Sequence, residues 1–145
     1  MNKYLKIFIW ITLLSAISLI GLIVYWLVYP YKTIESPSKY QILTPTIKVG
    51  DNLVYRAYYC KYTNMVPTDV KRQLVDGLIY DLPVSTANNF AKGCRTVDVS
   101  VPMVVPMSLI DYNQRYYLRI TVTYKPNPLR TITVISETEG FTITK

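Results

Sequence analysis

The chain has 145 residues, half of them apolar, with a formal net charge of +7 and no histidine. This length accommodates one membrane segment and one small domain, but not two globular domains. Without histidine, Ser-His and Cys-His nucleophile pairs are excluded, and the commonest transition-metal ligand is missing. The basic residues form no run or stripe, so no nucleic-acid partner is predicted.

The first predicted element is an apolar helix over residues 7–29. No charged residue occurs from Ile7 to Tyr31, and about 20 apolar residues cross a hydrocarbon core about 30 Å thick. The alternative is a cleaved signal peptide. Its apolar run is only about 7–15 residues long and ends in small residues, which Val28-Tyr29-Pro30-Tyr31 lacks. We therefore predict an uncleaved, single-pass signal anchor, preceded by a short tail over residues 1–6.

The orientation of this helix is not decided by its flanking lysines, because they occur at both ends. The short amino-terminal tail favours a cytoplasmic N-terminus, with the following domain in the periplasm or outside the cell. Residues 30–40 are polar and contain Pro37, which predicts a short stalk. Such a stalk would hold the domain close to the lipid bilayer.

Three small residues recur at three-residue spacing inside the predicted helix: Ser15, Ser18 and Gly21. Small side chains let helices approach closely, so this is a candidate helix-packing seam for self-association. The alternative is that the serine hydroxyls bond to carbonyl groups of their own helix.

From residue 41 to 145 the pattern is that of short strands separated by proline, glycine and asparagine turns. No helix long enough for a parallel crossover is predicted, only one helical turn over Ser85–Lys92. The strands number seven to eight, because the third and fourth are either separate or one bent strand. They are Gln41–Val49 (interrupted by Pro45), Leu53–Tyr62, Val70–Val75, Leu78–Leu82, Cys94–Val101, Arg115–Tyr124, Arg130–Ile135 and Phe141–Ile143. The fold class is therefore mainly β, as an antiparallel sandwich or small barrel.

The most regular strand carries Tyr116, Leu118, Ile120, Val122 and Tyr124 on one face, and the turn Pro126-Asn127-Pro128 and the strand Arg130–Ile135 follow it. These segments resemble the last two strands of an immunoglobulin-like or fibronectin-type sandwich, in which a tyrosine near the start of the penultimate strand makes a corner contact. The resemblance implies an antiparallel immunoglobulin-like β-sandwich over residues 41–145. The chain departs from true immunoglobulin domains, because no tryptophan lies between its cysteines and their spacing is short for an inter-sheet bridge.

The two cysteines, Cys60 and Cys94, both lie in the part predicted to be exported. In an oxidising compartment a bridge between them would stabilise the domain by about 3–4 kcal/mol in the chain-entropy model. The alternative is two unrelated buried thiols. We predict the disulfide.

Carboxylates are the remaining catalytic candidates. No pair of them, no glycine-rich phosphate loop and no calcium loop occurs at motif spacing, and acids beside turns are typical turn caps. The protein is therefore predicted to be non-enzymatic, without cofactor or metal. The carboxylates considered are Asp69, Asp76, Asp81, Asp98, Asp111, Glu137 and Glu139.

Tyrosine is unusually frequent, with 14 residues, and it is enriched at protein interfaces. The outward-facing Tyr117 and Arg119 of the most regular strand, with Arg56 and Tyr58 as neighbours, are therefore a candidate partner-binding face. The alternative is that tyrosine is simply a good strand former.

The predicted function is a membrane-anchored module that binds or assembles another envelope or membrane protein. The alternative is a membrane regulator, such as a phage exclusion or lysis-control factor, that acts partly through its helix.

Overall fold

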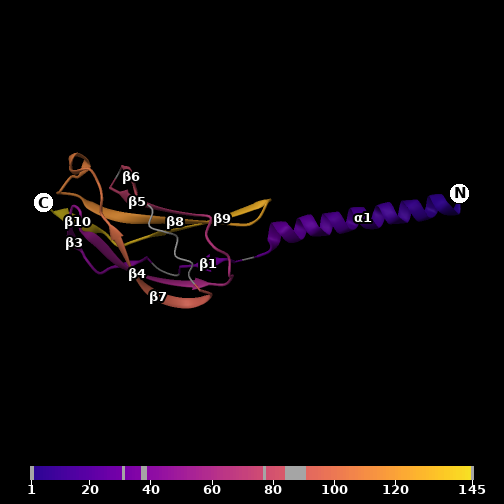
Figure 1. Ribbon diagram of the computed structural model, residues 1–145, viewed down its shortest axis with the longest axis horizontal. Helices are drawn as coiled ribbons and strands as arrows, with labels where there is room; N and C mark the ends of the chain where they lie inside the picture. Colours follow the sequence, from indigo (N-terminus) through magenta and orange to yellow (C-terminus); the bar gives the residue numbers. More distant parts are fainter. Residues whose placement is uncertain (1, 31, 37–38, 77, 84–90, 145) are drawn as a thin grey trace.

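The computed structural model describes residues 2–30, 32–36, 39–76, 78–83 and 91–144. A single helix, α1 (Lys3–Val28), projects from one end of a β-rich domain (Figure 1). The helix has 26 residues, and none of them is buried. At about 1.5 Å per residue it is about 39 Å long, which exceeds the hydrocarbon thickness of about 30 Å. By length and composition, α1 is able to cross a membrane.

Two sheets form the domain, and Figure 1 shows them as two layers. The described ranges contain ten strands: β1 (Ile34–Glu35), β2 (Gln41–Ile42), β3 (Thr46–Lys48), β4 (Asn52–Lys61), β5 (Asp69–Val75), β6 (Ile79–Leu82), β7 (Gly93–Pro102), β8 (Arg115–Asn127), β9 (Arg130–Glu137) and β10 (Phe141–Thr144), together with a 3-10 turn at Met107–Leu109. In the first sheet, β4 pairs with β7 and with both β1 and β2. In the second sheet the order is β3-β10-β8-β5-β6, and β9 also pairs with β8.

The mainly β fold class is confirmed, with two differences in the strands. The predicted strand Gln41–Val49 is divided at Pro45 into β2 and β3, which lie in different sheets. β1 was missed, and it lies inside the predicted stalk, where it pairs with the end of β4. The folded domain therefore reaches back to Ile34. Gln41 had been predicted as its first residue.

The expectation of purely antiparallel pairing is wrong for one pair of strands. β3 runs parallel to β10, with Ile47 opposite Ile143. The reason is that the chain crosses from one sheet to the other at Pro45 without reversing direction. β5 and β6 are separate strands that pair antiparallel, as one of the two alternatives predicted. The predicted helical turn Ser85–Lys92 lies largely outside the described residues.

The core lies between the two sheets and contains side chains from both. Alternation along residues 53–59 of β4 and 116–124 of β8 directs every second residue inward, and these inward residues are apolar or aromatic. Several core side chains are completely buried, and they come from both layers: Leu53 and Val101 from the first sheet, and Leu74, Tyr116, Leu118 and Ile143 from the second.

Four of the tyrosines are core residues: Tyr55, Tyr59, Tyr116 and Tyr124. The Tyr55 ring also stacks on Tyr40 with the centroids 5.6 Å apart. A cavity of ≈ 50 Å³ remains between the sheets beside these rings and Arg72. Much of the tyrosine content therefore fills the core, and this part of the composition is not a sign of a binding face.

Burial of Tyr124 has a consequence at alkaline pH. Desolvation raises the pKa of its hydroxyl from 10.0 to about 12. Because folding favours the neutral form, this contribution is fully present below about pH 10 and is lost as the pH rises from 10 through 12; it amounts to about 2–3 kcal/mol. We expect Tyr124→Phe to reduce the alkaline loss of thermal stability, measured as Tm against pH by circular dichroism. Tyr58→Phe, at an exposed ring, is the control, and an unchanged profile in Tyr124→Phe would contradict the prediction.

Tyr116 closes the loop that precedes β8. Its hydroxyl accepts a hydrogen bond from the Asp111 backbone N–H at 2.7 Å and donates to the Asp111 carbonyl at 3.1 Å. We expect Tyr116→Phe to lower the free energy of unfolding by about 1–3 kcal/mol, because both partners lose a bond in a part-buried site. Chemical denaturation measures this loss. Tyr117→Phe, on the opposite face of β8, is the control and should change stability little.

Candidate interaction surfaces and the helix–domain junction

The predicted partner-binding face is not a single face. Arg56 and Tyr58 point outward from β4 in the first sheet, whereas Tyr117 and Arg119 point outward from β8 in the second. Because the core separates the two sheets, the two pairs lie on opposite sides of the domain. The prediction that these four residues form one face is therefore wrong. Strand alternation identified Tyr117 and Arg119 as outward residues correctly, but it did not decide which face of β4 is buried, and it could not show which sheet each strand joins.

Both arginines of this predicted face make ion pairs across neighbouring strands. Arg56 lies opposite Asp98 and donates to its two carboxylate oxygens at 2.7 and 2.9 Å. These hydrogen bonds lower the pKa of the Asp98 carboxyl group. Arg119 lies opposite Glu137 at 3.1 Å. Such exposed pairs stabilise a protein by about 0–1 kcal/mol, so their main effect here is to order the surface of each sheet.

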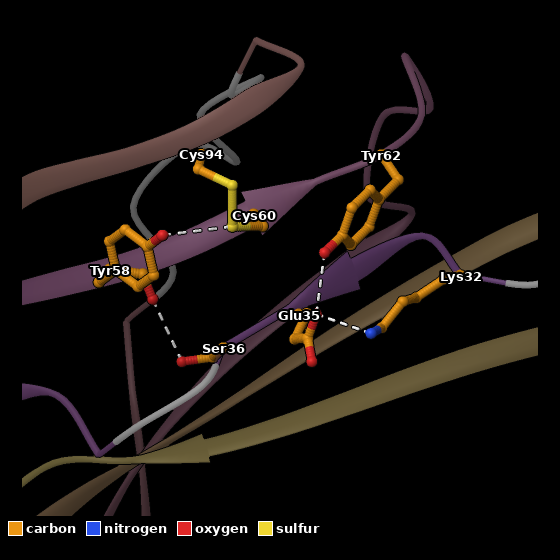
Figure 2. Close-up of a disulfide and its surroundings, with 7 residues drawn as sticks. All are labelled: Lys32, Glu35, Ser36, Tyr58, Cys60, Tyr62 and Cys94. Atoms are coloured by element: carbon orange, nitrogen blue, oxygen red, sulfur yellow. Dashed lines mark hydrogen bonds and ion pairs between the residues drawn. A yellow bond between two sulfur atoms is a disulfide. The ribbon is translucent and has the colours of Figure 1, made fainter.

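The predicted disulfide between Cys60 and Cys94 is present. The two cysteines are register partners on β4 and β7, so the bond joins adjacent strands of one sheet. Figure 2 shows the Tyr58 ring beside it, where the Tyr58 hydroxyl donates to the Cys60 sulfur at 3.5 Å. The Ser36 hydroxyl, from the segment after β1, donates to the Tyr58 carbonyl at 3.3 Å. The disulfide therefore lies at the end of the domain where the chain enters from α1.

A polar cluster attaches this entering segment to β4 (Figure 2). Glu35 forms an ion pair with Lys32 at 2.6 Å and accepts a hydrogen bond from the Tyr62 hydroxyl at 2.9 Å. These two interactions, that with Lys32 being the larger, lower the pKa of the Glu35 carboxyl group. The Tyr62 backbone N–H donates to the Thr33 carbonyl at 2.9 Å. The segment predicted as a stalk is thus bound to the domain from Lys32 to Ser36.

The end of α1 is bound to the turn between β8 and β9. The Asn127 side chain donates to the Trp26 carbonyl at 2.6 Å, and the Arg130 guanidinium donates to the carbonyls of Val28 and Pro30 at 2.7 and 2.9 Å. The last carbonyls of a helix have no partner within the helix, so side chains from elsewhere commonly satisfy them. We call this set of contacts the helix–domain junction. It fixes the domain against the helix end, and it joins residues about 100 positions apart, so no local sequence pattern reveals it.

Exposed apolar side chains occur on the β5–β6 hairpin and on the loop that follows β7. Figure 1 shows both segments at the end of the domain away from α1. β6 lies beside the 3-10 turn, since the Tyr80 hydroxyl donates to the Leu109 carbonyl at 3.3 Å. We call these side chains the distal apolar cluster, which comprises Leu78, Ile79, Val104, Met107 and Leu109. Their exposed fractions run from 45% to 68%.

The helix seam residues Ser15, Ser18 and Gly21 are all exposed along α1. The Ser15 hydroxyl donates to the Thr12 carbonyl at 2.9 Å, as the alternative reading of this motif expected. A side chain added at Gly21 would meet nothing within 4 Å. The residues thus remain accessible to a second helix, and self-association stays a prediction.

The candidate carboxylates are dispersed. Asp76 and Asp111 each accept a hydrogen bond from the backbone N–H two residues later, at 2.8 and 2.9 Å, which is the turn-capping role predicted for them. Within the described ranges, no group of three or more metal-ligating side chains is close enough together to hold a metal ion.

Comparison of the sequence with protein-family models and with curated proteins finds no match.

Removing the Arg130 contacts tests the helix–domain junction. We expect Arg130→Ala to speed amide exchange at Tyr29, Lys32 and Thr33, because the Val28 and Pro30 carbonyls lose their donor. The core should be little affected, so the Tm should stay close to that of the parent protein. Hydrogen–deuterium exchange of the full chain in detergent measures both regions. Lys125→Ala, which removes an exposed cation on the same hairpin, is the matched control; equal exchange in the two variants would contradict the contact.

Proposed function

We propose that this protein is a membrane-anchored, non-enzymatic module that binds or assembles another envelope or membrane protein. The observation that carries the proposal is the pairing of an apolar helix with no buried residue and a folded domain bound to its end. In water such a helix would expose apolar surface along its whole length, whereas lipid removes that cost. The domain is then held at the bilayer, and its opposite end projects away from it.

We further propose that the N-terminus is cytoplasmic and that the domain is periplasmic or extracellular. The disulfide supports this side, because such bonds persist in oxidising compartments and are rare in the cytosol. Alkylation of intact cells with a thiol-reactive polymer, followed by denaturation, tests it. We expect no mass increase without reductant and two additions after reduction. Addition without reductant would place the cysteines in a reducing compartment and contradict this orientation.

The immunoglobulin-like fold is likewise proposed. Its support is the pairing of β4 with β7 in one sheet and of β5, β8 and the last strands in the other, with β3 parallel to β10. A second support is the Tyr116 hydroxyl bonded to the backbone five residues upstream, which resembles the tyrosine corner of such domains. The disulfide differs from the usual bridge, since it stays within one sheet.

The distal apolar cluster is the surface we propose for the partner. It replaces the four residues predicted from the sequence, which lie on two opposite sides of the domain. Apolar side chains at the centre of an interface supply much of its binding energy. The cluster also lies at the end of the domain that projects away from the membrane, because the helix–domain junction holds the other end at the bilayer.

Photo-crosslinking in the native membrane tests this surface. A photoreactive residue in place of Val104 is expected to give a specific adduct, and one in place of Thr133, exposed on β9, is not. The adduct should be lost in Met107→Asp and retained in Thr131→Asp. Adducts of equal yield at both sites, or resistance to Met107→Asp, would contradict the assignment.

The second candidate is a membrane regulator that acts partly through its helix. The helix–domain junction favours it, because a rotation or tilt of α1 would pass directly to β8 and β9. An exchange of residues 7–24 for an unrelated apolar sequence separates the two functions, since it keeps the Trp26, Val28 and Pro30 carbonyls. The binding module should still capture its partner, whereas the regulator should lose its effect.

A further inference from the structure

The turn between β8 and β9 lies at the depth where α1 leaves the hydrocarbon. α1 is uncharged from Ile7 onward, and about 20 residues at about 1.5 Å each span the hydrocarbon core, so its far boundary falls near Trp26 to Val28. Asn127 is hydrogen-bonded to the Trp26 carbonyl at 2.6 Å. The turn is therefore held beside the last helical turn, at the level of the lipid headgroups.

The side chains of this turn suit that environment. Leu129 is 53% exposed, and its backbone N–H donates to the Asn127 side-chain oxygen at 3.0 Å, which fixes the shape of the turn. Lys125 is exposed on the same hairpin, whereas the Arg130 guanidinium, next to Leu129, is bound to the Val28 and Pro30 carbonyls. An apolar tip beside an exposed cation is typical of segments that lie in a membrane interface, where the apolar part enters the acyl boundary and the cation faces phosphates.

The three tip residues Asn127, Pro128 and Leu129 thus have two distinct tasks. Asn127 satisfies a helix carbonyl, and Leu129 remains exposed. The tip of the turn lies at the level of the lipid headgroups and points away from the domain. An exposed side chain at the tip is therefore surrounded by lipid.

We propose that Pro128 and Leu129 insert into the headgroup region of the same membrane that α1 crosses, as a second membrane contact of the domain. The inference rests on the proposed membrane span. Two contacts, one through α1 and one through the hairpin, set the tilt of the domain and hence the direction in which the distal apolar cluster points.

Quenching of tryptophan fluorescence by brominated lipids tests the insertion. The full chain is reconstituted into phosphatidylcholine nanodiscs with or without bromine on the acyl chains. Three proteins are compared in a Trp10→Phe background: one that keeps Trp26, one with Trp26→Phe and Leu129→Trp, and one with Trp26→Phe and Val104→Trp. Asn127 bonds the backbone of residue 26, so Trp26→Phe leaves that contact intact.

We expect the Leu129→Trp protein to be quenched to a similar extent as the protein that keeps Trp26, with blue-shifted emission. The Val104→Trp protein, which reports from the distal end, should be unaffected by bromine. Adding Asn127→Ala should release the tip and reduce quenching of the Leu129→Trp protein, while quenching of Trp26 persists. Circular dichroism of each protein checks that the domain is folded.

The other outcomes overturn one proposal or the other. If Trp26 is quenched and the Leu129→Trp protein is not, the hairpin lies outside the lipid and the insertion is wrong, whereas the membrane span stands. If neither is quenched in folded protein, α1 does not cross this bilayer, and both proposals fail.

Discussion

Replacing both cysteines, as Cys60→Ala with Cys94→Ser, is expected to lower the free energy of unfolding of the domain by about 4 kcal/mol. The two cysteines are 34 positions apart, and in the chain-entropy model the bond removes the closure entropy of that loop from the unfolded chain. The fold itself should remain, because the bond lies near one end of the β4–β7 ladder and the strands pair from Asn52 and Pro102 up to it. Denaturation of the full chain in detergent, followed by near-ultraviolet circular dichroism of the tyrosines, measures the loss.

Reduction provides the control for this experiment. A phosphine reductant should lower the Tm of the parent protein by about as much as the double substitution does, and it should leave the double variant unchanged. A loss of unfolding free energy below about 1 kcal/mol would contradict the prediction. It would mean that residual pairing of the two strands already closes this loop in the unfolded chain, so that the disulfide adds little constraint.

Truncating Leu118 to alanine is the second large effect expected. Leu118 is completely buried in β8, the strand that pairs with β5, β9 and β10. Leu→Ala at such a site removes apolar contacts and leaves a cavity that the neighbours fill only in part, so we expect a loss of about 3–4 kcal/mol. The midpoint of urea denaturation should fall, with the slope unchanged.

Thr121→Ala is the matched control on the same strand, since Thr121 faces outward and is half-buried. It should change stability by less than about 1 kcal/mol. If the two substitutions had similar effects, β8 would not present its Leu118 face to a packed core, and the two-layer arrangement of the sheets would be wrong.

Local sequence patterns were sufficient to predict features that depend only on residues close together in the chain. The absence of charge from Ile7 onward was enough to predict a helix long enough for a membrane. Alternation along residues 115–124 predicted which face of β8 is buried, because side chains on a strand alternate strictly between its two sides. The turn-capping roles of Asp76 and Asp111 were also readable, since a carboxylate bonds a backbone N–H only two residues away.

Features that join distant parts of the chain could not be read in this way. β1 has two residues and is a strand only because the end of β4 lies beside it. The division of β2 from β3 depends on which sheet each one reaches, and alternation contains no information on that choice. Because alternation does not show which sheet a strand joins, Arg56 and Tyr58 were predicted to share a face with Tyr117 and Arg119, although the core separates the two pairs.

The sequence by itself determined that the protein has an apolar helix, a small mainly β domain and two cysteines in that domain. Composition and short-range periodicity are enough for these properties, since they follow from burial of apolar side chains and from the pleat of a strand. Only the tertiary structure decided how the helix and the domain are joined. The carbonyls at the end of α1 need donors, and the folding of β8 and β9 brings Asn127 and Arg130 to them across about 100 residues. That junction turns a predicted stalk into a fixed connection, and it leaves the distal apolar cluster at the end of the domain away from the helix.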